Sequence, residues 1–210
     1  MFLKDSMQML LVIGLLALNF GISWFNAYSV GRSWVDSKVT GGWPRFVVWC
    51  AAIMSASGFT WCYLIVLALV ARTTGYLEPQ YVQTALEIGY VIIIIPIIGS
   101  GLGIWIDSVT TAWRRRDFAS VATAGWNTYA QAHNVYQAAS TLPGIFSHLG
   151  DVFDGGDSDD KKSKAILFVF LLVLVALCGG VLTTVLIIRS TARGYAGAVV
   201  SESRLTRARS

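Results

Sequence analysis

The chain has 210 residues, of which 55% are hydrophobic and only 13% are charged, and its mean hydropathy is +0.60. These values are typical of an integral membrane protein and exclude an ordinary water-soluble enzyme domain. The formal net charge is only +4. Basic residues of a membrane protein favour the phosphate surface of the bilayer, so no nucleic-acid partner is expected.

Four long stretches of the sequence contain no Asp, Glu, Lys or Arg. They cover residues 6–31, 46–71, 88–106 and 165–188. A helix needs about 20 mainly apolar residues to cross a bilayer, because it rises ~1.5 Å per residue through about 30 Å of hydrocarbon. The runs are continuous and lack the alternation of barrel strands. The sequence therefore predicts an all-α, polytopic membrane protein with a single membrane domain over residues 1–210. The four predicted transmembrane helices are residues 7–28, 46–71, 84–106 and 165–188.

The first two connections between these spans are short. Residues 31–45 contain Gly41, Gly42 and Pro44, which favour a break in the helix. Residues 72–83 form the second connection. Inside the third span, Pro96 is expected to kink the helix, because proline removes one backbone hydrogen bond and clashes with the preceding turn.

The third connection, residues 107–164, is the only long one. Apolar and small residues recur in it at i, i+3 and i+4, which predicts an amphipathic helix over about residues 109–139, ended by Pro143 and Gly144. We expect one face of this helix to dock on lipid headgroups or on a neighbouring helix. That face contains Phe118, Val121, Ala122, Tyr129 and Tyr136. Residues 151–164 have the composition of a solvated linker, and residues 189–210 form a basic tail.

Four crossings would place both termini and the second connection on one side of the membrane. The first and third connections would then share the other side, with nine Lys and Arg residues against seven. The nine are Arg32, Lys38, Arg45, Arg114, Arg115, Arg116, Lys161, Lys162 and Lys164. The seven are Lys4, Arg72, Arg189, Arg193, Arg204, Arg207 and Arg209. Basic residues close to the spans weigh most in orientation. We therefore predict that the first and third connections are cytoplasmic, in a bacterial-type inner membrane or a plasma membrane.

The sequence offers little chemistry inside the predicted spans. Ionisable groups there usually mark proton relays or ion paths, and only Glu87 lies within a span, at its mouth. Glu87 fits a pore mouth, or simply a headgroup-facing residue at a helix N-terminus. His133 and His148 lack partners at zinc-ligand spacing, and no nucleophile-base motif occurs. No catalytic residue, metal, cofactor or small-molecule substrate is inferred, and the protein is predicted not to be an enzyme.

Small residues four positions apart occur on three of the spans. Such pairs let helix backbones approach closely, so we expect them to form packing or assembly faces. The pairs are Ala17 with Gly21, Ala51 with Ser55, and Gly99 with Gly103.

The order of short, short and long connections resembles the tetraspanin plan, but the third connection has no cysteine and so lacks the CCG motif of that family. No family is assigned on this basis. The sequence favours a non-enzymatic membrane subunit or scaffold that assembles with copies of itself or with other membrane subunits in the lipid bilayer. The alternative is a channel or pore whose path runs between protomers.

Overall fold

A computed structural model describes residues 2–154 and 160–207 of the chain, and all of its regular elements in these ranges are helices. The helices are α1 (Phe2–Thr40), α2 (Gly42–Thr73), α3 (Pro79–Arg115), α4 (Phe118–Asp154) and α5 (Asp160–Arg207). Four of them, α1, α2, α3 and α5, are long and apolar enough to cross a membrane. The predicted all-α class with four such helices is confirmed.

The helices extend well beyond the predicted spans. The first connection was predicted over residues 31–45, but α1 continues to Thr40 and only Gly41 separates it from α2. The turn is this tight because Gly41 and Gly42 both adopt positive φ, 60° and 54°, which glycine reaches without a steric penalty. The Gly41 N–H donates a hydrogen bond to the Ser37 carbonyl, 2.9 Å away, which closes the end of α1.

The third connection contains a helix, but its predicted bounds are wrong. Residues 109–115 continue α3, and the break falls at Arg116, the one described non-glycine residue with positive φ (56°). Asp117 then caps α4, because the Ser120 backbone N–H donates to Asp117 Oδ1 at 2.7 Å. This hydrogen bond is the main reason that the pKa of Asp117 lies below its usual value.

The helix α4 also continues through Pro143 to Asp154, although the sequence predicted an end at Pro143 and Gly144. A proline removes a single helical hydrogen bond. Here α4 is held against the molecule on both sides of it, since Ala138 and Ile145 are both buried. Packing along the helix therefore outweighs the local cost of the proline.

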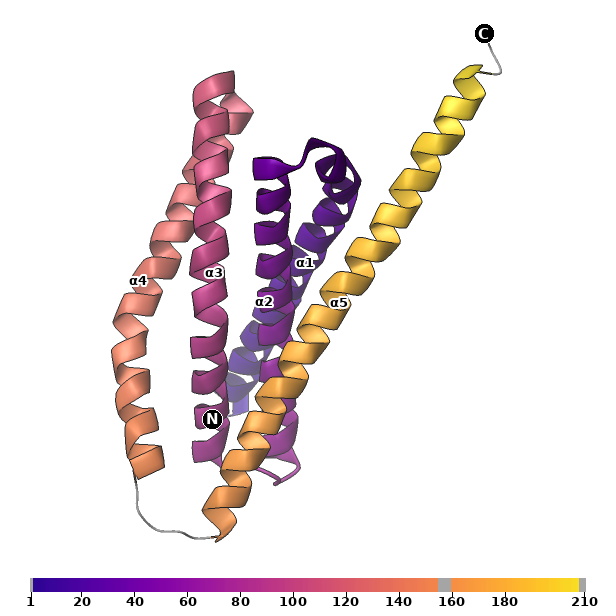
Figure 1. The fold of residues 1–210 in the computed structure, drawn as a ribbon. Helices are drawn as coiled ribbons and strands as arrows, with labels where there is room; N and C mark the ends of the chain where they lie inside the picture. Colours follow the sequence, from indigo (N-terminus) through magenta and orange to yellow (C-terminus); the bar gives the residue numbers. More distant parts are fainter. Residues whose placement is uncertain (1, 155–159, 208–210) are drawn as a thin grey trace.

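Two clusters of buried apolar residues hold the bundle together. One cluster joins α2, α3 and α5 around Leu64, Ile88 and Val169, and the other joins α1, α2 and α5 around Phe59 and Ile187. In the described residues, α4 contacts α3 alone. It is a single layer on the outside of the bundle (Figure 1).

The direction of each helix follows from contacts at the two ends of the bundle. The start of α5 lies beside the α2–α3 connection, where the Phe168 and Tyr76 rings stack with centroids 6.4 Å apart. Further along, α5 reaches the end of α1, where the Arg32 guanidinium lies 5.8 Å from the Tyr195 ring centroid. Helices α3 and α5 therefore run in the same direction. Helix α4, which lies between them in the sequence, runs in the opposite direction (Figure 1).

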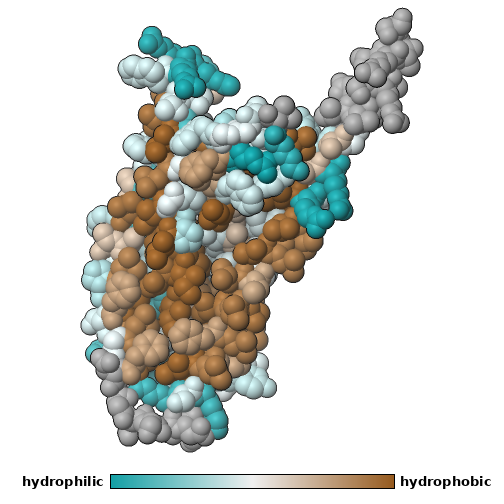
Figure 2. Space-filling model, viewed as in Figure 1, coloured by the Kyte–Doolittle hydropathy of each residue, from teal (hydrophilic) through white to brown (hydrophobic). Residues whose placement is uncertain are grey.

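The outer surface between the two ends is mostly apolar. Large side chains such as Leu15, Ile95 and Leu171 are more than half exposed in the isolated chain. Figure 2 shows this apolar surface as a broad band with hydrophilic groups gathered above and below it. A surface of this kind matches a molecule whose solvent is the hydrocarbon core of a membrane.

Candidate functional site: a polar seam between α3 and α4

Polar contacts join α3 and α4 at three levels along their length. At one end the Trp105 Nε1–H donates to Thr128 Oγ1 at 2.9 Å. In the middle the Gln131 Nε2–H donates to the Ile98 carbonyl at 3.0 Å. At the other end His148 meets Glu87. We call this set of contacts the seam, and it shows that residues 128–148 of α4 lie alongside the apolar run of α3.

The middle of the seam depends on a glycine. Gln131 is only 8% exposed, and its amide lies directly over Gly101, where an added Cβ would collide with Gln131 Oε1. The small residue therefore admits the amide, and the amide gains a carbonyl partner that it needs away from water. Sequence patterns alone do not single out Gln131, because its partners Ile98 and Gly101 are distant in the chain.

Glu87 is turned toward α4. Its Oε2 lies 2.6 Å from His148 Nδ1, and its Oε1 accepts a hydrogen bond from Gln83 Nε2 at 2.8 Å. The Glu87 side chain is 14% exposed and the His148 side chain 35%. Neither reading of Glu87 from the sequence included this partner, because the two residues are 61 positions apart.

A cavity of about 320 Å³ adjoins the seam on the side that faces α1 and α2. Its polar lining comes mainly from α4, with Asn19 from α1 and Ser57 from α2. The α4 residues are His133, Asn134, Gln137 and Thr141. Polar groups thus gather at the depth of the apolar spans.

The predicted contact face of α4 points away from α3. Phe118 is 89% exposed, Tyr129 63% and Tyr136 68%, and Val121 and Ala122 are exposed as well. In the described chain, this face touches no other helix, so its docking on lipid or on another subunit stays a prediction. The side that meets α3 carries Ala124, Gln131 and Ala138 instead, together with the half-buried Asn127 and Asn134.

The small-residue pairs divide between inside and outside. Ser55 is buried and its hydroxyl donates to the Ser23 carbonyl at 2.8 Å, while Ala51 packs beside the second apolar cluster. Gly103 lies against Phe46 and Cys50 of α2.

The other small residues face outward. Ala17, Gly21 and Gly99 are exposed, and no atom of another part of the chain lies within 4 Å of where a Cβ of either glycine would be. Only part of the predicted set therefore packs helices together within one chain.

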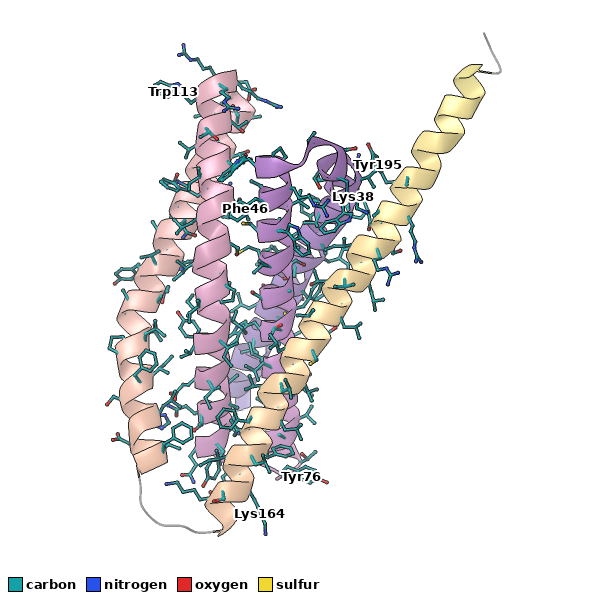
Figure 3. All side chains as sticks on the ribbon, in the orientation of Figure 1. Lys38, Phe46, Tyr76, Trp113, Lys164 and Tyr195 are labelled. Carbon is teal, nitrogen blue, oxygen red and sulfur yellow. The ribbon has the colours of Figure 1, made fainter. Side chains whose placement is uncertain are left out.

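The two ends of the bundle differ in charge. We call the end formed by the α1–α2 turn, the α3–α4 turn and the second half of α5 the basic end. It carries ten basic residues within the described ranges: Arg32, Lys38, Arg45, Arg114, Arg115, Arg116, Arg189, Arg193, Arg204 and Arg207. The opposite end carries five: Lys4, Arg72, Lys161, Lys162 and Lys164. Figure 3 shows Lys38, Tyr195 and Trp113 toward the basic end and Tyr76 and Lys164 at the other.

These features define the class of the molecule, an integral membrane protein built only from helices in the ranges that the structure describes. Comparisons with family models, with curated proteins and with solved structures give no match. Over the same ranges, no three His, Cys, Asp or Glu residues come together as a metal site would require.

Proposed function

We propose that the protein is a non-enzymatic subunit of a membrane complex, and that α4 is the helix through which it assembles. The observation that carries this proposal is the position of α4 beside the apolar run of α3, with polar side chains on its flanks. Helix α4 is not among the helices apolar enough to cross a membrane alone. A helix of this composition at that depth calls for a protein partner or water beside it.

The uncovered polar groups of α4 make this argument specific. His133, Gln137 and Thr141 are exposed, and α4 contacts only α3 among the described helices. An amide or imidazole facing hydrocarbon without a hydrogen-bond partner is costly, by several kcal/mol in a fully apolar medium (about 4–8 kcal/mol for transfer of an amide or hydroxyl). A second copy of the chain, or another membrane subunit, would cover these groups and the aromatic side of the helix.

The same geometry supports a topology with five crossings. Since α3 and α5 run in the same direction, α4 must bring the chain back across the membrane between them. The basic end, with ten basic residues against five, then lies in the cytoplasm according to the positive-inside rule. The C-terminal half of α5 shares that side with the α1–α2 turn, and the start of α1 lies on the other. A bacterial inner membrane or a plasma membrane is the setting proposed.

Replacing Tyr129 by Asp is expected to break the assembly while leaving the protein in the membrane. Tyr129 is 63% exposed and lies on the outward side of α4, where its ring contacts are with Trp126 and His133 of its own helix. A carboxylate there would be buried unpaired at a subunit interface, which costs several kcal/mol. The measurement is the oligomeric mass of purified wild-type and Tyr129→Asp protein in mild detergent, together with the membrane fraction of each.

Trp113→Asp serves as the matched control, because Trp113 is an aromatic residue of similar exposure (77%) near the α3–α4 turn, beyond the seam. Its oligomer should equal that of the wild type. A wild-type protein that is monomeric in native membranes and in detergent would contradict the proposal. An assembly unchanged by Tyr129→Asp would rule out α4 as its interface.

A pore between protomers is the second candidate, and the cavity beside the seam favours it. Its polar lining from α4, together with Glu87 at the end of the seam, would give water a path where two copies meet. In this case liposomes containing the protein should show cation flux, and Glu87→Gln should change the rate severalfold. Absence of flux in wild-type liposomes would leave the assembly subunit as the function.

A further inference from the structure

A groove lies at the basic end between α1, α2 and α5. At this end α5 leans away from α1 and α2 (Figure 1). Its volume is about 730 Å³, within the range of about 300–1,000 Å³ that is usual for ligand sites. The walls come from the last part of α1, the first part of α2 and the second half of α5. The groove lies on the far side of the bundle from α4, so it is separate from the seam.

Three cations stand at the rim of this groove. Lys38, Arg189 and Arg193 line it, no Asp or Glu is among the lining residues, and all three side chains are exposed. In the described ranges none of the three makes an ion pair. Nearby, the Arg45 guanidinium lies 4.6 Å from the Trp34 ring centroid, and its Nη1 is buried without a hydrogen-bond partner. A rim that carries cations and no carboxylate favours the binding of an anion.

The floor of the groove has the opposite character. It is built from small and branched apolar side chains, among them Ala52, Ile53 and Val185. Trp34 and Trp49 form its wall, with ring centroids 5.0 Å apart in an edge-to-face arrangement. Tryptophan rings at such a level are typical of the membrane–water interface. An apolar floor that continues from a cationic rim at this depth matches an amphiphile that carries its negative charge at one end.

We propose that the groove binds an anionic phospholipid, with the phosphate between Lys38, Arg189 and Arg193 and an acyl chain along the floor. Basic pockets between helices on the cytoplasmic side of membrane proteins bind anionic headgroups in this way. A zwitterionic lipid would place its ammonium group against the cations.

The test uses the full chain in detergent micelles with added phosphatidylglycerol or phosphatidylcholine, followed by native mass spectrometry. The wild type should retain phosphatidylglycerol in preference to phosphatidylcholine. A variant with Lys38→Gln, Arg189→Gln and Arg193→Gln should bind phosphatidylglycerol about 100-fold more weakly, from about a fivefold loss for each basic residue near the headgroups. The matched control carries Arg114→Gln, Arg115→Gln and Arg116→Gln, which removes three cations from the same end but away from the groove, and its affinity should be unchanged.

Two further arms decide between the acyl chain and a free phosphate as the ligand. Phosphatidylglycerol brominated in its acyl chains should quench the fluorescence of Trp34 and Trp49, and the fraction of fluorescence that is quenched should fall in the Trp34→Phe, Trp49→Phe variant, which keeps the other six of the eight tryptophans. Ala192→Trp narrows the groove and keeps every charge, so it should weaken lipid binding. This variant tests the groove as the lipid site even if the triple Gln variant fails to fold. Equal retention of the two lipids, equal losses in both triple variants, or displacement of the lipid by millimolar inorganic phosphate would overturn the proposal.

Discussion

A cysteine placed at Asp151 is expected to react with a membrane-impermeant maleimide from outside intact cells, whereas one placed at Trp113 should react only after the membrane is opened. The difference is all-or-none because the two positions lie beyond the apolar surface at opposite ends of the bundle. Asp151 is exposed near the last turns of α4, and Trp113 is exposed near the α3–α4 turn. The residues between them run alongside α3 through the seam, from Thr128 to His148.

The labelling controls use one position at each end of the bundle, and neither position is on α3 or α4. Tyr76→Cys in the α2–α3 connection should behave like Asp151→Cys, and Lys38→Cys near the end of α1 should behave like Trp113→Cys. The native Cys50 and Cys62 are buried, and Cys178 lies within the apolar part of α5. All labelling variants are built in a protein in which these three cysteines are replaced by Ala, so that only the introduced thiol reacts. Reaction of Trp113→Cys and Asp151→Cys from the same side would show that α4 does not cross, and the five-crossing topology would be wrong.

The transmembrane helices could be predicted because an apolar run of sufficient length has one stable solution in lipid. A helix satisfies its own backbone hydrogen bonds wherever its neighbours lie. The length of an uncharged run therefore reports the presence of α1, α2, α3 and α5 directly. The same reasoning makes the predicted helices too short. Polar residues such as 107–115 can continue a helix after it has left the hydrocarbon, and an uncharged run does not report them.

The position of α4 could not be predicted from its own residues. Its hydropathy is too low to indicate a crossing, and what holds it beside α3 is a set of pairings that are distant in sequence, such as Gln131 with Ile98 and Glu87 with His148. A signal did exist in the distribution of basic residues. Four crossings divide them nearly evenly, nine against seven, whereas the observed helix directions separate ten from five within the described ranges. The positive-inside rule favours the more uneven division and so supports the five-crossing topology that we propose.

Cap residues could also have located the α3–α4 turn. Asp117 is a strong N-cap residue, and its carboxylate can accept a hydrogen bond from the backbone N–H of Ser120, three positions later. The structure shows this hydrogen bond. Periodicity alone extended the predicted helix back to residue 109, because α3 and α4 both carry apolar positions at helical spacing. Local capping chemistry is therefore the better guide to where one long helix stops and the next begins.

Gly180→Ala is expected to destabilise the protein strongly, although no sequence pattern singles out this glycine. Gly180 of α5 is buried at its contact with α2, where an added Cβ would collide with Thr60 Oγ1 and come within 2.6 Å of the Thr60 amide nitrogen and 2.8 Å of the Ala56 carbonyl oxygen. Backbone atoms cannot rotate away, so the two helices must separate. Overpacking of this kind costs about 1–3 kcal/mol, which corresponds to roughly 3–10 °C in the melting temperature of a chain of this size.

Gly99→Ala is the control, and its expected effect has the opposite sign. Gly99 lies in the middle of α3 and faces outward, with no atom of another part of the chain within 4 Å of an added Cβ. Alanine in an unobstructed helix position is favoured over glycine by about 0.5–1 kcal/mol, so the melting temperature of the monomer in detergent should rise slightly. Equal destabilisation by the two substitutions would show that α5 does not cross α2 at Gly180, and that glycine content rather than its position governs the stability of the bundle.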